Sequence, residues 1–326
     1  MSDKPNPDMQ LADEFVRFTD RNVFLTGKAG TGKTTFLHNL KRDCPKRMIV
    51  TAPTGIAAIN AGGMTLHSFF QIPFGPYVPG SATDDRGSLH RFNRDKVNII
   101  RSLDLLVIDE ISMVRADLLD SVDAALRRHR RSDLPFGGAQ LLMIGDLCQL
   151  APVVTGADRD ILRAHYDSPY FFSSRSLART DLVTIELQHI YRQSDSRFIE
   201  LLNRVRDNKL DPTTLAELNR RYVPGFVPRD EEGYITLSTH NRGADAINRD
   251  KLGALPGRDH RFQAEVEGEF PEFMYPTEAV LDLKVGAQVM FVRNDSSPGK
   301  LYYNGKIGSV ARIEDDLVHV KCPTDT

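Results

Sequence analysis

One segment constrains the fold of this chain more than any other, the glycine-rich run Gly27–Thr34. Its letters fit the pattern G-x-x-x-x-G-K-[ST], and it lies between an apolar run, Val23–Leu25, and a helical pattern that begins near Lys33. Glycines allow the backbone to curl so that successive N–H groups face phosphate oxygens, and a helix N-terminus adds its positive end. A chance glycine-rich turn would not require both flanking elements. The segment therefore predicts a phosphate-binding loop between a strand and a helix.

The polar residues of this loop have expected roles. Lys33 would reach the β- and γ-phosphates of a bound nucleotide, and the Thr34 hydroxyl would hold Mg²⁺. The expected cofactors are therefore ATP and Mg²⁺. The other loop positions expected to bind the nucleotide are Gly27, Gly30, Thr31, Gly32 and Thr35.

Size, charge and cysteine content narrow the class of protein. The chain has 326 residues, of which 40% are hydrophobic, enough for about two or three packed domains. No apolar run approaches the roughly 20 residues of a membrane-spanning helix, and the polar N-terminus resembles neither a secretory signal nor a transit peptide. Cys44, Cys148 and Cys322 lack the spacing of zinc ligands, which fits a reducing cytoplasm. A formal net charge of −2 argues against a generally basic nucleic-acid binder but allows a locally charged groove.

Apolar runs alternate with helical patterns over residues 1–183. This alternation is typical of a parallel sheet that helices cover on both faces. A stretch rich in proline, glycine and charge, Ile72–Asn98, interrupts it and is expected to be an insertion. The expected strands are Val23–Thr26, Met48–Ala52, Leu105–Ile108 and Gln140–Gly145, and the expected helices are Met9–Arg21, the segment from the loop to Asp43, Ile56–Ala61 and Ala116–Arg131.

A second α/β unit is expected over residues 184–326. From about His260 its pattern changes to β-structure, and Asn304–Gly305 predicts a hairpin turn between Leu301–Tyr303 and Lys306–Ile313. The earlier expected elements of this unit are a strand at Thr184–Leu187, helices within Asp195–Asn208 and Pro212–Tyr222, a strand at Tyr234–Ser238 and a helix at Arg242–Leu252.

Two carboxylates follow the apolar run Leu105–Ile108, in the form of a Walker-B motif. Ligands in an open α/β sheet bind at the carboxyl ends of the strands. Asp109 is expected to bind Mg²⁺, and Glu110 to orient and deprotonate an attacking water. A solvated acidic turn is the alternative, and the strand together with the upstream phosphate loop disfavours it.

Two further polar positions follow expected strands. The Gln149 amide could bond both the γ-phosphate and the attacking water, and the alternative is an ordinary polar turn. Arg192 could cross a cleft to the γ-phosphate, where a guanidinium stabilises developing charge. The alternative for Arg192 is a surface arginine without a role in catalysis.

Several segments could contact nucleic acid. Phe69 and Phe70 could stack on bases, although buried core aromatics are the favoured interpretation. The run Arg127–Arg131 could bind phosphates, but cations at a helix end complement the helix dipole, and this interpretation is preferred. The basic insertion 72–98 is a candidate wedge that parts a duplex.

His240 and Arg242 lie where an expected strand meets a helix. A DNA phosphate could bind at such a helix start. A helix cap by Asn241 explains the same residues equally well.

Taken together and in this order, the motifs resemble those of superfamily-one DNA helicases of the PIF family. The resemblance covers about Gln10 to Arg312, and the helix Phe198–Leu210 resembles the signature helix of that family. The other matching strings are Gly27–Thr35, Ala52–Ala58, Thr65–Phe70, Ile108–Met113, Gly145–Val153 and Leu187–Gln193.

The resemblance implies an α/β fold with two RecA-like domains, 1–183 and 184–326, the second incomplete. It implies an ATP hydrolase and DNA helicase that moves 5′ to 3′ along single-stranded DNA, opens duplexes at single-strand junctions and unfolds G-quadruplexes. Gln10 would read adenine, Gln149 and Arg192 would sense the γ-phosphate, and the DNA strand would lie against Pro53, Thr54, His67 and Ser68. The implied setting is a monomer on DNA, in the cytoplasm and with the nucleoid of a bacterium, away from membranes. Roles in DNA repair, recombination and telomere maintenance follow from the same resemblance.

The chain departs from the family pattern in one respect. A Ser-Gln-Gly-type DNA-contact segment and an Ala-Leu-Ser-Arg segment with a second γ-phosphate arginine do not occur in it. A truncated or unusually short member would show this, and a chain without that arginine is expected to bind ATP and DNA but turn over slowly. The alternatives are therefore a non-catalytic module that binds nucleotide and single-stranded DNA, or another phosphate-loop enzyme such as a nucleotide kinase.

Overall fold

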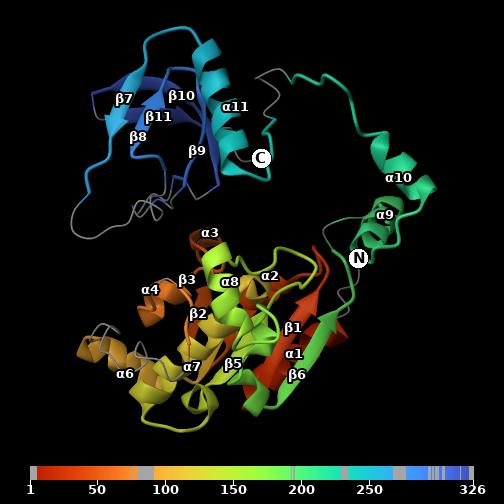
Figure 1. The fold of residues 1–326 in the computed structure, drawn as a ribbon, viewed down its shortest axis with the longest axis vertical. Helices are drawn as coiled ribbons and strands as arrows, with labels where there is room; N and C mark the ends of the chain where they lie inside the picture. The colour runs from red at the N-terminus through yellow and green to blue at the C-terminus, as the bar shows by residue number, and fades with distance from the viewer. Residues whose placement is uncertain are drawn as a thin grey trace. The chain divides into compact units, whose positions relative to one another are not determined.

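The computed structural model divides the chain into two compact units, Met1–Arg220 and Arg221–Thr326. Figure 1 shows the helices and strands of both units. The structure describes residues 6–73, 75–78, 92–191, 193, 195–228, 234–266, 277–292, 295, 297, 301–302, 305–315 and 317–322.

The first unit is built on a six-stranded sheet with the order β3-β2-β4-β5-β1-β6, in which all neighbours are parallel. The central strand β4 is a run of four apolar residues that are all fully buried, as expected for a parallel strand covered on both faces. The strands are β1 (Asn22–Gly27), β2 (Met48–Ala52), β3 (Met64–Thr65), β4 (Leu105–Ile108), β5 (Gln140–Ile144) and β6 (Leu182–Leu187).

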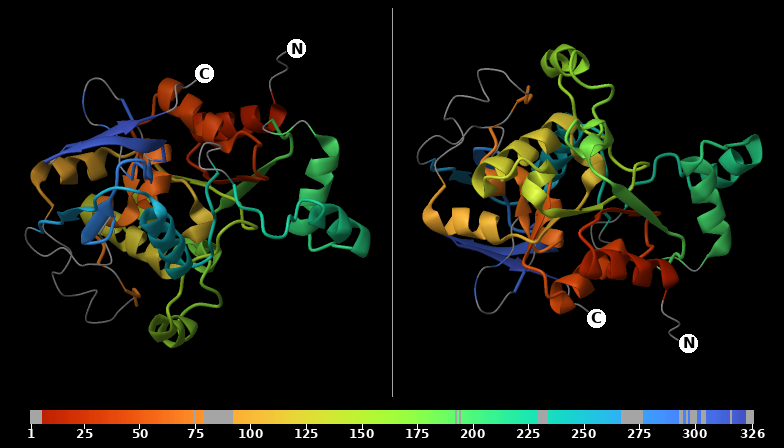
Figure 2. Two further views of the ribbon diagram at one scale, coloured as in Figure 1. Left: turned by 90° about the horizontal axis from the view of Figure 1, so that it is seen from above. Right: turned by 90° about the horizontal axis from the view of Figure 1, so that it is seen from below.

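Helices cover both faces of this sheet, as the sequence predicts. On one face, Phe24 and Leu106 pack with side chains of α4, α6 and α7, and on the other Val23 and Leu105 pack with α1 and α2. In Figure 2 the red α1 and the gold α6 and α7 lie on opposite sides of the sheet. The α-helices are α1 (Pro7–Phe18), α2 (Lys33–Asp43), α3 (Gly55–Asn60), α4 (Leu66–Phe70), α6 (Arg94–Ser102), α7 (Ala116–Arg130), α8 (Gly156–Arg163), α9 (Ser196–Arg206) and α10 (Pro212–Asn219), and the short 3₁₀ helices are Ile111–Met113, Pro135–Gly138, Phe171–Ser173 and Leu177–Arg179.

Strand β6 belongs to the first unit, which corrects the expectation that Thr184–Leu187 opens the second. It pairs with β1 from Asn22↔Leu182 to Gly27↔Leu187. Ile185 and Leu187 are buried in the same core as Leu25, and this burial explains the pairing. The division between compact units falls after Arg220, not at residue 184.

The expected insertion, residues 72–98, is shorter at its C-terminal end. Helix α6 begins at Arg94, where the Asn93 side chain accepts a hydrogen bond from the Lys96 N–H, and its Ile100 is fully buried in the core. Residues 94–98 therefore belong to a helix that covers the sheet. Phe74 and residues 79–91 of the candidate wedge lie outside the described residues.

The aromatic and basic runs of this unit have structural roles. Phe69 and Phe70 are buried in the core, as the favoured interpretation predicts. Arg130 closes the end of α7 by donating to the Gly137 and Leu103 carbonyls at 2.7 and 2.6 Å, and Arg127 pairs with Asp123 at 3.8 Å.

The second unit contains α11 (Asn241–Ala254) and two antiparallel sheets. The predicted change to β-structure near residue 260 is confirmed, but the predicted strand at 234–238 is wrong: these residues pair with no strand, and Tyr234, Ile235 and Leu237 are exposed. The strands are β7 (His260–Gln263), paired with β8 (Val280–Leu283), and β9 (Gln288–Met290), β10 (Ile307–Glu314) and β11 (Leu317–Lys321), in the order β11-β10-β9.

The predicted hairpin turn includes Asn304, which lies outside the described residues. Strand β10 pairs with β9 and β11, and the Phe291 N–H donates to the Lys306 carbonyl on the extension of the β9 pairing. The Asp295 N–H donates to the Tyr302 carbonyl, so Tyr302 lies opposite Asp295 in the segment after β9.

A buried carboxylate network gives a test of stability in the first unit. Asp120 on α7 accepts hydrogen bonds from the Tyr166 hydroxyl at 2.9 Å, the Ser174 hydroxyl at 2.5 Å and the Ser176 N–H at 2.9 Å. Asp120→Ala would leave these buried donors without an acceptor, so we expect it to lower the free energy of unfolding by about 3 kcal/mol. Urea unfolding followed by circular dichroism measures this. The exposed Asp133 provides the control, since Asp133→Ala should change stability by less than about 0.5 kcal/mol; equal midpoints for the two variants would contradict the role of the network.

Candidate functional site

The phosphate loop follows β1 and leads into α2. Gly27, Gly30 and Gly32 have φ angles of 148°, 81° and 93°, which residues other than glycine rarely adopt. A Cβ atom on Gly27 would lie 2.8 Å from both the Leu187 carbonyl oxygen and the Thr31 hydroxyl oxygen. The loop is thus a curled backbone that only glycine can form at these positions.

Lys33 lies at the start of α2 and points back into this loop. Its ammonium donates to the Gly27 carbonyl at 2.5 Å and to the Lys28 carbonyl at 3.1 Å, and the buried Thr31 hydroxyl also donates to Lys28, at 2.8 Å. Burial lowers the pKa of Lys33, and the carboxylates of Asp146, Glu110 and Asp109 partly oppose that shift. Lys33 is therefore the cation around which three carboxylates gather.

Asp109 and Glu110 extend from the buried end of β4. The Asp109 carboxylate accepts a hydrogen bond from the Glu110 N–H at 3.0 Å, and Glu110 has left-handed backbone angles, with φ 50° and ψ 43°. Such a conformation in a residue other than glycine is typical of functional sites. Burial raises the pKa of both carboxyls. At Asp109 the hydrogen bond from the Glu110 N–H and the charge of Lys33 oppose this rise, whereas at Glu110 the charge of Asp109 adds to it and Lys33 opposes it.

The segment after β5 brings a third carboxylate to the same edge of the sheet. Asp146 is buried, with 1% of its side chain exposed, and accepts from the Gln149 side-chain amide at 3.2 Å. Gln149 itself is exposed. The sequence pattern assigns Asp146 no role, because its ion-pair partner, Arg206, is 60 residues away along the chain.

The magnesium positions that the sequence suggests fit the ion chemically. Thr34 is exposed in the first turn of α2, next to Lys33. Asp109 directly follows β4, which neighbours β5, and β5 in turn neighbours β1, the strand that leads into the phosphate loop. Hydroxyl and carboxylate oxygens are the protein ligands that Mg²⁺ prefers. Thr35, also in this first turn, is exposed as well.

Two side chains that sequence reasoning did not single out flank the loop. The methyl group of Met9 and the ring of Tyr191 both lie next to Gly32, and the Tyr191 N–H donates to the Gly30 carbonyl at 2.8 Å. Gln10, the expected adenine contact, is exposed on α1, where its amide donates to Glu14 at 3.0 Å. Tyr191 lies within the motif string 187–193, which was the available signal. Arg192 lies outside the described residues.

The expected DNA-contact residues of the first unit share the carboxyl edge of the sheet. Pro53 and Thr54 follow β2, His67 and Ser68 follow β3, and these two strands are parallel neighbours. Thr54 caps α3 by accepting from the Ala57 N–H at 3.3 Å, and Thr65 accepts from the Ser68 N–H at 3.1 Å. Burial, and secondarily the charge of Arg115, lower the pKa of His67, so its imidazole is neutral at neutral pH.

His240 and Arg242 lie in the second unit at the start of α11. His240 is the residue before the helix, and the Thr239 hydroxyl lies 2.9 Å from its Nδ1. Arg242 is exposed in the first turn. His240 and Arg242 lie close together in the second unit, whereas the phosphate loop belongs to the first.

A family model described as PIF1-like helicase matches residues 9–215. The chain belongs to the PIF1-like helicase family. Among curated proteins it is 35% identical over 310 residues to the ATP-dependent DNA helicase PIF1 of Saccharomyces cerevisiae, which covers 90% of this chain and 34% of the yeast protein. It is 37% identical over 304 residues to human PIF1, which covers 90% of this chain and 44% of the human protein. The chain thus spans between a third and a half of the length of these relatives.

Solved structures of PIF1-like proteins resemble the whole chain. A crystal structure of Bacteroides Pif1 bound to single-stranded DNA matches with a TM-score of 0.81 and 43% identity, covering 97% of this chain and 71% of that one. A structure of two Pif1 helicases at forked double-stranded DNA matches with the same TM-score and 41% identity, covering 99% and 74%. In the part of the chain that the structure describes, no helix is both long and apolar enough to span a membrane.

The close approach at Gly27 leads to a prediction about nucleotide binding. Gly27→Ala would place a methyl group against the Leu187 carbonyl and the Thr31 hydroxyl, so the loop would have to open. We expect the affinity for ATP to fall by about tenfold or more, since one misplaced loop group costs at least 1.4 kcal/mol. Titration with a fluorescent ATP analogue measures this. Gly156→Ala is the control, because a Cβ at Gly156 meets nothing within 4 Å; an equal affinity in the two variants would contradict the prediction.

Proposed function

We propose that this PIF1-like chain hydrolyses ATP to move along single-stranded DNA and to separate duplexes. The observation that carries the proposal is that Lys33, Asp109, Glu110 and Asp146 follow the carboxyl ends of β1, β4 and β5, which are parallel neighbours in one sheet. The candidate strand-contact segments, 53–54 and 67–68, follow strands of the same sheet and lie at the same edge. Nucleotide chemistry and strand binding would therefore be neighbours on one rigid element.

The proposed chemistry is attack of water on the γ-phosphate. The curled backbone of 27–32 and the helix start at Lys33 bind the phosphates, and Lys33 leaves the Gly27 and Lys28 carbonyls to bond the β- and γ-oxygens. Glu110 orients the water and accepts its proton. Mg²⁺, held by Thr34 and Asp109, neutralises phosphate charge when it is bound. Gln149 bonds the γ-phosphate, and Arg192 is proposed to add a guanidinium there.

The proposed DNA partners are single strands and junctions of single and double strand. Support comes from the solved relatives, which are described with single-stranded DNA, with forked DNA and, in Bacteroides Pif1, with ADP-AlF3. Pro53, Thr54, His67 and Ser68 would hold the strand, with His240 and Arg242 of the second unit as further contacts. We propose 5′ to 3′ movement by a monomer, with G-quadruplex DNA as an additional substrate.

ATP hydrolysis with and without single-stranded DNA tests the function. We expect DNA to stimulate turnover, and we expect Lys33→Ala to abolish the stimulated rate because it removes the cation of the phosphate site. Lys209→Ala, at an exposed lysine on the same unit, is the control. Duplexes with a 5′ or a 3′ tail, and a strand with a G-quadruplex, then test direction and substrate. Binding of both ligands without stimulated turnover would indicate a binding module, and turnover indifferent to DNA would indicate another phosphate-loop enzyme.

The proposed role of Glu110 separates binding from hydrolysis. Glu110→Gln keeps the size of the side chain but removes the proton acceptor, so we expect turnover to fall by about 10²–10⁴-fold while ATP binding is kept. Single-turnover hydrolysis and an equilibrium titration measure the two quantities. Glu314→Gln makes the same change on β10 and should alter neither. Unchanged hydrolysis in Glu110→Gln would assign the base elsewhere.

A further inference from the structure

An ion pair connects α9 to the nucleotide edge. Arg206, the last residue of α9, donates from Nη1 to Oδ2 of Asp146 at 2.6 Å, across 60 residues of sequence. Asp146 is 1% exposed and Arg206 is 21% exposed. A buried ion pair of this kind is sensitive to the loss of either partner, because the remaining charge stays buried without compensation.

The same carboxylate also holds the proposed γ-phosphate sensor. Oδ2 of Asp146 accepts from the Gln149 amide at 3.2 Å, and Oδ1 accepts from the Cys148 N–H at 3.0 Å. Arg206 and Gln149 are thus two donors to one oxygen atom. Because both donors share this oxygen atom, a change in the hydrogen bond from Gln149 alters the strength of the hydrogen bond between Arg206 and Asp146.

The charge of this pair is felt inside the phosphate site. Asp146 raises the pKa of Lys33 and of Glu110, while Arg206 lowers that of Lys33. Burial disfavours the ionised form of Asp146, but the hydrogen bonds from Arg206, Cys148 and Gln149 outweigh burial and hold its pKa below the ordinary value. Arg206 therefore offsets a carboxylate beside the place where the γ-phosphate would bind.

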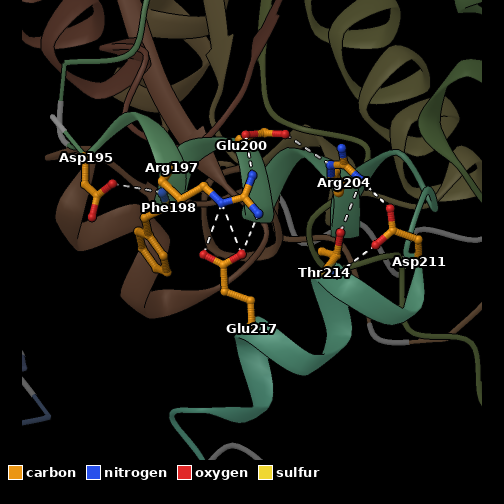
Figure 3. Close-up of polar contacts among 8 residues, drawn as sticks. All are labelled: Asp195, Arg197, Phe198, Glu200, Arg204, Asp211, Thr214 and Glu217. Atoms are coloured by element: carbon orange, nitrogen blue, oxygen red, sulfur yellow. Dashed lines mark hydrogen bonds and ion pairs between the residues drawn. The ribbon is translucent and has the colours of Figure 1, made fainter.

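Helix α9 and helix α10 form one cross-linked hairpin (Figure 3). Arg197 bonds Glu200 on its own helix at 2.7 Å and Glu217 on α10 at 2.5 Å. Arg204 bonds Asp211 at 2.6 Å and the Thr214 hydroxyl at 3.2 Å. These contacts tie the two helices at both ends of α9, so a displacement at Arg206 is passed to the hairpin as a whole.

We propose that Arg206 is a positioning residue of the nucleotide site, and that through it the α9–α10 hairpin follows the presence of the γ-phosphate. When the Gln149 amide turns from Asp146 to the γ-phosphate, Arg206 becomes the sole side-chain donor of the two to that carboxylate. The α9–α10 hairpin then moves toward the proposed nucleotide site. The chain continues from α10 directly into the second unit. This inference rests on the proposed function, because it assigns Gln149 to the γ-phosphate.

A comparison of ATP with ADP distinguishes this role from a purely structural one. In Arg206→Gln, the uncompensated Asp146 carboxylate would repel the γ-phosphate and compete for Gln149. We expect affinity for a non-hydrolysable ATP analogue to fall by about tenfold, within the usual range for coupled sites, while affinity for ADP changes less than about twofold. Arg204→Gln is the matched control, with the same change of charge on the same helix, and should leave both affinities unchanged. Arg206→Lys should restore part of the preference for ATP.

Hydrogen exchange of α9 in the full chain provides the second measurement. Adding the ATP analogue with Mg²⁺ should change the exchange of residues 196–206 in the unmodified chain and in Arg204→Gln, but not in Arg206→Gln. Equal losses of ATP and ADP affinity in Arg206→Gln, or an α9 that does not respond to nucleotide in the unmodified chain, would overturn the inference. A chain that binds neither nucleotide would instead overturn the proposed function, and the two failures are therefore distinguishable.

Discussion

The parallel pairing of β1 with β5 and of β5 with β4 brings the carboxyl ends of three buried strands to one line. The middle of each strand is apolar and buried, and functional polar residues follow at its carboxyl end. For β1 that is the phosphate loop, for β4 it is Asp109, and for β5 it is Asp146. The proposed nucleotide site follows from this register: its side chains are distant along the chain and come to one edge because the strands are parallel neighbours.

This arrangement concentrates negative charge in a partly buried site. Asp109, Glu110 and Asp146 carry like charges, and the described cations that offset them are Lys33 and Arg206. Burial raises the pKa values of Asp109 and Glu110, whereas the hydrogen bonds of Asp146 keep it ionised. Neighbouring carboxyls in one site thus have pKa values shifted in opposite directions, which is common where residues divide different chemical tasks.

Much of the first unit could be predicted from the sequence, because buried strands leave a strong local pattern. The strands Met48–Ala52 and Leu105–Ile108 have the predicted bounds, and the phosphate loop and α7 lie where expected. The local sequence pattern does not say which sheet a strand joins. It therefore predicts the wrong unit for β6. The exposed segment 234–238 has strand-like residues but pairs with no strand among the described residues, and propensity alone could not reveal that.

The candidate site was predictable to the extent that its residues lie in contiguous motifs. Lys33, Asp109 and Glu110 are of this kind. Asp146 and Arg206 also lie in matching strings, but no single string reveals their contact, which depends on how α9 returns to the end of β5. Met9 on α1 and Tyr191 after β6 lie next to Gly32 although both are distant from it along the chain. Contacts between distant segments are set by packing, which no single stretch of sequence records.

The pairing of β6 with β1 also has a mechanical consequence. Strand β6 is an edge strand, and the chain leaves it toward α9, α10 and the second unit. Tension applied along the axis of β6 would load all six paired positions at once, from Leu182 to Leu187, instead of peeling them apart one at a time. Bonds that share a load in shear resist far more force than bonds that open in succession. The pairing of β6 with β1 is thus an attachment that resists load along the strand direction.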